Sequence, residues 1–228
     1  MLRLRPRQRV EFSPFESGSA IHYVFQQMVN HYGSEGLYAL SPEEMDAEIR
    51  RYLTEYIDRM VPAPAAVTAR FRYQFQRLRL MLGFILRHMA EEFAQSEFTA
   101  AATEVPVGEG GEVSSPRLAA EDGTPITLRG SIDRVDLFHG ADGDYLRVID
   151  YKSGTKEFKF EEVAYGLNMQ MLIYLFAACG DENHRFGTPQ PAGVLYLPSR
   201  LEAIEVTQDS TAAVSYTHLR AHETSAHL

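Results

Sequence analysis

The sequence predicts an α/β domain in which a small mixed sheet is flanked by helices. Three observations predict it: helical periodicity in the first hundred residues, hydrophobic alternation typical of strands after residue 103, and an apolar helix followed by one buried strand. Of the 228 residues, 45% are hydrophobic and 23% are charged, which is a globular balance. Such a composition excludes wholesale disorder, and the length fits one ordinary domain.

The first two helices are predicted by an apolar stripe and by a capping signal. Over residues 14–32, apolar side chains recur at helical spacing along one face. A Gly/Ser break at 33–36 ends this helix. Ser41 is then the expected N-cap of a helix that reaches about residue 60, because Pro42 and Glu44 occupy the first helical and capping-box positions.

A long third helix is expected at about 65–96, after a Pro-containing break. It carries the densest basic stretch in the middle of the chain: Arg70, Arg72, Arg77, Arg79 and Arg87. A solvated face is the usual explanation of such a run, and a DNA-facing helix is the alternative.

Strands dominate the second half. We expect strands at 103–107, 126–138, 145–152 and 192–197, a helix at 160–179, and a further strand at 201–206. The second and third strands form a hairpin around the turn at 139–144, which contains an Asp-Gly pair. Residues 208–228 are expected to be an unstructured tail, and 215–228 resemble translated sequencing-adapter read-through more than a His-rich metal site.

Composition excludes several classes of protein. The single cysteine, Cys179, excludes an internal disulfide and any multi-cysteine metal site made by this chain alone. A net charge of −9 argues against a wholly basic nucleic-acid binder, although an enzyme can hold DNA in a local basic groove. No apolar run is long enough for a membrane span. We therefore expect a cytoplasmic protein without a membrane partner.

The hairpin carries the most informative residues. In a strand, alternate side chains share a face, so Asp150 and Lys152 point the same way, and Asp133 on the neighbouring strand can approach Asp150. Two close carboxylates repel each other unless a divalent cation such as Mg²⁺ or Mn²⁺ offsets their charge. Lys152 could hold a water or stabilise charge that develops on a phosphate. The alternative is a pair of solvated acids with a surface lysine.

These motifs together resemble the RecB-like branch of the PD-(D/E)XK nuclease superfamily. Its Gly-x-x-Asp and Asp-x-Lys patterns match 130–133 and 150–152, and its Gln-x-x-x-Tyr pattern matches Gln170 and Tyr174 on one helical face. Gly18-x-x-x-His22 resembles the helix signature of the branch. A core glutamine and a structural histidine are the plain alternatives.

The resemblance narrows to the nuclease domain of AddB-type subunits of bacterial helicase–nucleases, over residues 2–206. It implies a restriction-endonuclease-like core with a helical insertion at 34–97, forming one domain over 1–207. It implies the following metal ligands: His22, Asp133, Asp150 and the carbonyl of Tyr151. Lys152 would orient water or steady charge, Gln170 would position Lys152 or the phosphate, and Tyr174 would support the helix face.

Two further residues are weaker candidates for the site. Glu104 falls where the family has an acidic position. Arg134 could contact DNA phosphates, although an ion pair with Asp136 explains it equally well.

The implied activity is Mg²⁺-dependent hydrolysis of single-stranded DNA ends by an exonuclease paired with an AddA-type subunit, in double-strand break repair and recombination. The chain departs from the family in lacking the four cysteines of its 4Fe-4S cluster. We interpret it as a fragment cut on both sides. The alternatives are a stand-alone RecB-like exonuclease and a non-catalytic DNA-binding or scaffold module.

Overall fold

The computed structural model describes residues 14–60, 68–116, 118–152, 160–165 and 169–198. The chain divides into two compact units, Met1–Ser96 and Glu97–Leu228. The predicted strand at 201–206 and the predicted tail lie outside the described residues. The assignment of 1–207 to one domain stays a prediction.

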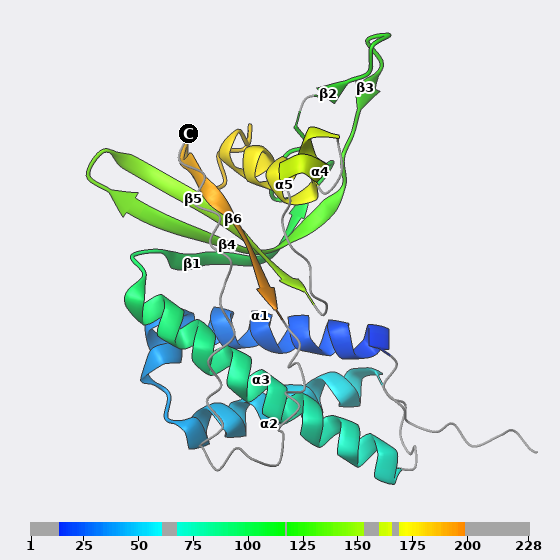
Figure 1. Cartoon of the computed structure of the whole chain (residues 1–228), viewed down its shortest axis with the longest axis vertical. Coiled ribbons are helices and arrows are strands. Elements are labelled where there is room, and N and C mark those ends of the chain that lie inside the picture. Colours follow the sequence, from blue (N-terminus) through cyan, green and yellow to red (C-terminus); the bar gives the residue numbers. More distant parts are fainter. Residues whose placement is uncertain (1–13, 61–67, 117, 153–159, 166–168, 199–228) are drawn as a thin grey trace, which may run out of the picture. The chain divides into compact units, whose positions relative to one another are not determined.

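The first unit contains three helices that pack against one another: α1 (Pro14–Ala39), α2 (Pro42–Met60) and α3 (Ala69–Gln95) (Figure 1). Each helix buries an apolar stripe, which includes Phe25 and Met28 on α1 and Leu82 on α3. The predicted break after residue 32 is a local interruption at Gly33, whose φ of 63° leaves the helical region, and helical structure resumes beyond it. Only glycine adopts this conformation without a steric penalty.

Caps fix the starts of α2 and α3. The predicted capping box is confirmed: Glu44 N–H donates to Ser41 Oγ over 3.2 Å, and Ser41 N–H donates to the Glu44 carboxylate over 2.9 Å. Thr68 caps α3 by accepting a hydrogen bond from Phe71 N–H over 3.0 Å. Helix α3 therefore begins at Ala69, later than predicted, because Thr68 itself has an extended backbone.

The second unit is built on a four-stranded mixed sheet, which confirms the predicted fold class. Its strands are β1 (Thr99–Val107), β4 (Gly130–Gly140), β5 (Gly143–Lys152) and β6 (Gln190–Pro198), in the order β1-β4-β5-β6. The first two pairings are antiparallel and the β5–β6 pairing is parallel.

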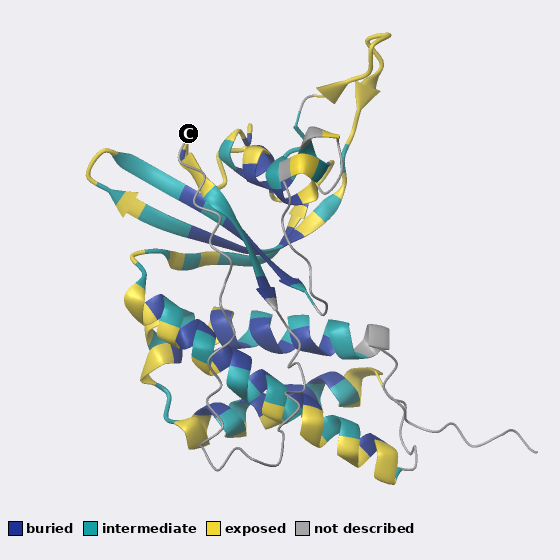
Figure 2. Ribbon diagram, viewed as in Figure 1, coloured by how far each residue is buried: buried dark blue, intermediate teal, exposed yellow. Residues whose placement is uncertain are grey.

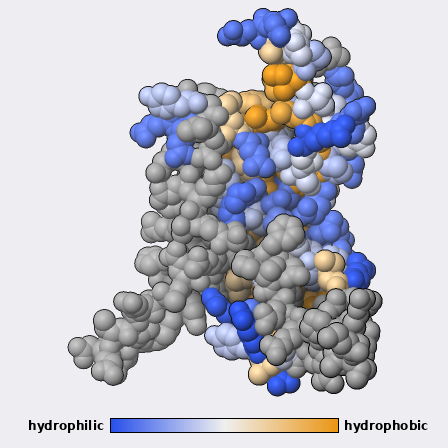
Figure 3. All heavy atoms as spheres, turned by 90° about the vertical axis from the view of Figure 1, so that its right-hand side faces the viewer, coloured by the Kyte–Doolittle hydropathy of each residue, from blue (hydrophilic) through white to orange (hydrophobic). Residues whose placement is uncertain are grey.

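A separate two-stranded ribbon lies between β1 and β4 in the sequence. It pairs β2 (Leu118–Ala119) with β3 (Pro125–Ile126), so the strand predicted at 126–138 is wrong at its start. Leu118 and Ile126 are directly paired and remain 42% and 43% exposed. Among the residues that Figure 3 colours by hydropathy, most of the visible surface is hydrophilic, with a hydrophobic area in its upper part.

The predicted helix at 160–179 is two helices, α4 (Phe160–Ala164) and α5 (Gln170–Cys179). Helix α5 packs against β5 and β6. The core of this unit combines buried residues of the sheet and of α5, shown in dark blue in Figure 2. It includes Val135, Leu146, Val148, Met171, Leu175 and Ala178.

Tyr174 fixes α5 against the start of β4. A Cβ atom at Gly130 would lie 2.0 Å from Tyr174 Oη and 2.9 Å from Cζ, so only glycine leaves room for the ring. Gln170 Nε2 donates to the same hydroxyl over 3.2 Å. The glycine of the Gly-x-x-Asp pattern, Gly130, thus contacts the tyrosine of the Gln-x-x-x-Tyr pattern, Tyr174. This contact fixes the strand three residues before Asp133.

Asp181 joins two loops at the other end of α5. Its carboxylate is buried and accepts hydrogen bonds from Ser114 N–H (2.8 Å), Ser114 Oγ (2.7 Å), Asn183 N–H (3.2 Å) and Arg185 N–H (3.0 Å). Burial alone would raise the pKa of this carboxyl. The four donors outweigh it, so the pKa of Asp181 lies below its ordinary value.

Gly130→Ala should destabilise the protein by about 1–3 kcal/mol, because the methyl group overlaps the Tyr174 ring. Urea unfolding measures the change. The matched control is Gly18→Ala, where a Cβ meets no atom within 4 Å and should cost nothing. In a Tyr174→Val background the cost of Gly130→Ala should disappear. An equal cost in both backgrounds would show that the two residues are not in contact.

Asp181→Asn should lower stability by about 1–3 kcal/mol at neutral pH, because charge-assisted hydrogen bonds weaken. A carboxyl whose pKa is depressed by folding stabilises the fold above its unfolded pKa, near 4, and this contribution is lost as the pH falls through the folded pKa. The difference in unfolding free energy between wild type and variant should therefore shrink below about pH 4. A difference independent of pH would contradict this role.

Candidate metal-binding site

The central feature of the sheet is a fork between β4 and β5. Their pairing runs from Gly140 and Gly143 at the turn to Arg134 and Ile149, and it ends there. Beyond that point β4 continues against β1, while β5 continues against β6. The first residues past the last pair are Asp133 on β4 and Asp150 on β5.

One hydrogen bond closes the base of this fork. Tyr151 N–H donates to Asp133 Oδ2 over 2.7 Å. A backbone N–H inside a protein needs an acceptor, and here the carboxylate replaces the carbonyl that a continuing ladder would supply. The bond holds the Asp133 carboxylate beside the residue that follows Asp150. The direct approach of the two carboxylates stays a prediction.

The Asp-x-Lys pattern forms an ion pair along β5. Lys152 Nζ lies 2.8 Å from Asp150 Oδ2 and 3.0 Å from Oδ1, so the two side chains share a face as predicted. Asp150 is 6% exposed, whereas 30% of the Lys152 side chain reaches solvent. The ammonium group therefore balances a buried charge and still has a route to the surface.

Glu104 lies near Asp133 on β1, the strand that pairs with β4 on the side away from β5. Glu104 stands opposite Asp133 in the β1–β4 register, in which Val105 pairs with Ile132. Ligand oxygens of the two acids lie within 4.8 Å of one another. Like charges directly opposite each other in a sheet are destabilising, and a cation offsets them. Because oxygens bind Mg²⁺ or Ca²⁺ at about 2.0–2.6 Å, one ion can bridge this separation.

The backbone at Glu104 is unusual for a strand. Its φ of 50° lies in the left-handed region, which costs a non-glycine residue roughly 1–2 kcal/mol. Strain of this kind persists where the surrounding structure enforces it, and it is typical of functional sites. Sequence reasoning gave Glu104 little weight because the register that places it opposite Asp133 spans a long intervening loop.

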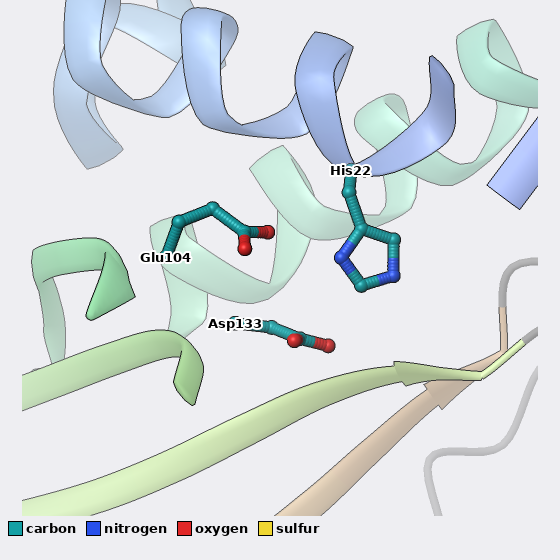
Figure 4. A group of neighbouring side chains, drawn as sticks. All are labelled: His22, Glu104 and Asp133. Carbon is teal, nitrogen blue, oxygen red and sulfur yellow. The ribbon is translucent and has the colours of Figure 1, made fainter. Parts of the chain in front are cut away.

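The remaining predicted residues fall on separate elements. His22 lies half-buried on α1 of the helical unit, one turn after Gly18. Figure 4 draws its imidazole, with Glu104 from β1 and Asp133 from β4. Gln170 is exposed as the first residue of α5, and Tyr174 is buried one turn later.

The structure corrects the DNA contact that was expected for Arg134. Its guanidinium is buried and pairs with Asp136, with Nε 2.8 Å from Oδ1 and Nη2 3.0 Å from Oδ2. Arg147 binds the same carboxylate over 3.0 Å. The ion pair, which sequence analysis left as the alternative, thus replaces the DNA contact. Burial raises the pKa of the neighbouring Tyr151 hydroxyl, against the opposing effect of Arg134.

Comparison with known proteins identifies the family of the chain. The family model of the PD-(D/E)XK nuclease superfamily matches residues 1–225. A protein from Symbiobacterium thermophilum, named as the B-type subunit of an ATP-dependent helicase/deoxyribonuclease, is 35% identical over 206 residues, covering 86% of this chain and 17% of its own. Proteins of the same name from Alkaliphilus oremlandii and Clostridioides difficile are 27% and 28% identical, covering 92% and 86% of this chain and 19% and 17% of their own.

The chain thus spans less than a fifth of the length of the curated relatives it matches. Among the helices that the structure describes, none combines the length and the apolar character needed to cross a membrane. The family match extends over nearly the whole sequence, including the fork and both of its acids. The chain belongs to the PD-(D/E)XK nuclease superfamily.

Proposed function

We propose that this chain is the metal-dependent DNA nuclease domain of an AddB-type protein of a helicase–nuclease complex. It hydrolyses phosphodiester bonds exonucleolytically on single strands. The observation that carries the proposal is the fork between β4 and β5, where Asp133 is bonded to Tyr151 N–H next to the Asp150–Lys152 ion pair. This places two acids and one ammonium group at the end of one strand pairing.

The donor set fits Mg²⁺ or Mn²⁺. Asp133, Glu104, Asp150 and the Tyr151 carbonyl supply the hard oxygen atoms that these ions prefer, and His22 supplies a nitrogen. The role of His22 as a ligand is proposed from the resemblance of Gly18-x-x-x-His22 on α1 to the family signature. When bound, the cation polarises the scissile phosphate and lowers the pKa of a coordinated water. With one cysteine, this chain cannot supply a 4Fe-4S cluster.

Lys152 and Gln170 act on the substrate. The Lys152 ammonium, held by both oxygens of Asp150, keeps a further N–H for the attacking water or for a phosphate oxygen that gains charge. Gln170 is exposed at the start of α5 and donates a hydrogen bond to Tyr174. In this proposal its amide positions Lys152 or the phosphate. Tyr174 is a positioning residue, because its ring fills the space above Gly130.

The biological setting follows from the relatives. Their shared name describes one subunit of an ATP-dependent helicase/deoxyribonuclease, which supports a heterodimeric AddA-type partner that delivers single-stranded DNA ends. The work of the complex is then double-strand break repair and recombination in the cytoplasm. A stand-alone exonuclease would show the same site without that partner.

Asp133→Asn should abolish Mg²⁺-dependent cleavage of single-stranded DNA while the protein stays folded, as circular dichroism measures. The amide oxygen still accepts the Tyr151 N–H, but the charge that binds the cation is lost. Cleavage of a labelled oligonucleotide measures the effect, with chelator as the blank. Asp144→Asn, at the other end of the hairpin, is the matched control and should retain full activity.

Lys152→Ala should abolish cleavage in the same assay. Because this change leaves Asp150 buried without its partner, Lys152→Arg is the second variant: it keeps the ion pair and the fold but misplaces the donor. Full activity in the folded Asp133 and Lys152 variants would remove the assignment of the site and favour a non-catalytic DNA-binding module.

His22→Ala should weaken Mn²⁺ binding roughly tenfold or more, since one ligand is lost. Isothermal titration calorimetry measures the dissociation constant. His31→Ala, an exposed histidine on the same helix, is the control and should bind Mn²⁺ like wild type. An unchanged dissociation constant for His22→Ala would give this histidine a structural role only.

A further inference from the structure

The outward face of α3 carries side chains that neither the helical core nor the nuclease site uses. The buried residues of α3, such as Leu78, Leu82 and Met89, follow one face of the helix. On the opposite face, residues recur at intervals of three, four and seven. They form what we call the α3 stripe: Arg70, Tyr73, Arg77, Leu80 and Arg87.

The stripe is open to solvent. Tyr73 is 68% exposed and Leu80 is 57% exposed, and Arg77 and Arg87 are also exposed. A tyrosine ring held at the surface of a long helix is a rigid flat surface with a polar tip. Such rings are the groups on which proteins stack unpaired bases.

The segment that contains the stripe is basic, whereas the chain as a whole is acidic. Residues 61–90 contain five arginines and no aspartate or glutamate, in a chain whose net charge is −9. A basic segment inside an acidic protein is complementary to a polyanion. The arrangement therefore differs from the mixed charges of an ordinary solvated helix.

Helix α2 shows what the ordinary arrangement looks like in this protein. Each of Arg50, Arg51 and Arg59 pairs with an acid three or four residues away on the same helix. Among the described residues, Arg77 and Arg87 make no ion pair, and Arg79, which pairs with Asp46, lies outside the stripe. The guanidinium groups of Arg77 and Arg87 are thus available for an external anion.

We propose that the α3 stripe binds single-stranded DNA without sequence preference. Arg77 and Arg87 contact phosphates, and Tyr73 stacks on a base. Fourteen residues separate Tyr73 from Arg87, or about 21 Å along the helix, which is enough for several nucleotides. The proposal rests on the proposed function, since it takes DNA as the polymer that this protein handles.

The test is fluorescence anisotropy with a labelled oligothymidylate of about 20 nucleotides, in chelator so that no cleavage occurs. Tyr73→Ala should weaken binding about tenfold, whereas Tyr73→Phe, which keeps the stacking ring, should bind like wild type. The double variant Arg77→Gln/Arg87→Gln should lower the slope of log K against log salt by about 1.4, because two phosphate contacts are lost.

Two matched controls exclude general effects of charge and of aromatic removal. Tyr38→Ala removes a tyrosine of similar exposure on α1, and Arg50→Gln removes an exposed arginine of α2. Both should bind like wild type. Equal affinity and equal salt slope in wild type and all stripe variants would overturn the proposal, and would instead fit a stripe that packs against another part of a longer polypeptide.

A second readout separates this proposal from the nuclease assignment. Cleavage of a dinucleotide, which is shorter than the strand that the stripe would hold, should proceed at the wild-type rate in the stripe variants. If the nuclease assignment fails, the wild type cleaves nothing, yet the loss of metal-free binding in Tyr73→Ala is still measurable. If wild type binds no single-stranded DNA in chelator, the stripe proposal itself is wrong.

Discussion

The site depends on the separation of β4 from β5 after Arg134 and Ile149. If β4 and β5 stayed paired to their ends, a backbone carbonyl would accept the hydrogen bond from Tyr151 N–H. Asp133 would then have no backbone donor. Because the strands part, β4 follows β1 and β5 follows β6, and one hydrogen bond from Tyr151 to Asp133 holds the base of the gap. The Asp133 carboxylate is thereby held beside Tyr151, and it lies near Glu104 of the neighbouring strand.

Charges near the fork differ in how they are balanced. Asp150 is matched by Lys152, and Asp136 is matched by two arginines, so these groups are satisfied within the protein. Glu104 and Asp133 lie opposite each other across the β1–β4 pairing, with ligand oxygens within 4.8 Å of one another. Two carboxylates this close repel each other, and a bound cation offsets the repulsion, which is why we propose the metal at these two acids.

Local patterns predicted most of the fold, because helix caps, hydrophobic alternation and the Asp-Gly turn act over a few residues. The capping box at Ser41 and the hairpin of β4 and β5 are examples. Features that depend on long-range register were missed. The place of Glu104 depends on a pairing across a long loop, and the split of β3 from β4 depends on a partner strand that alternation does not reveal.

The motif residues show the same division. Spacing along β5 was enough to predict that Asp150 and Lys152 meet. It could not show that Arg134 would be buried, since that depends on Asp136 and Arg147 converging from two strands. Nor could it show why residue 130 is glycine, because the reason is a tyrosine ring from a helix far along the chain.

The most direct test of the account is anomalous diffraction from crystals of the protein soaked with Mn²⁺. The account predicts one anomalous peak at the fork, with carboxylate oxygens of Asp133 and Glu104 about 2.0–2.6 Å from the ion. A peak elsewhere in the molecule, with both carboxylates left uncoordinated at saturating Mn²⁺, would contradict it.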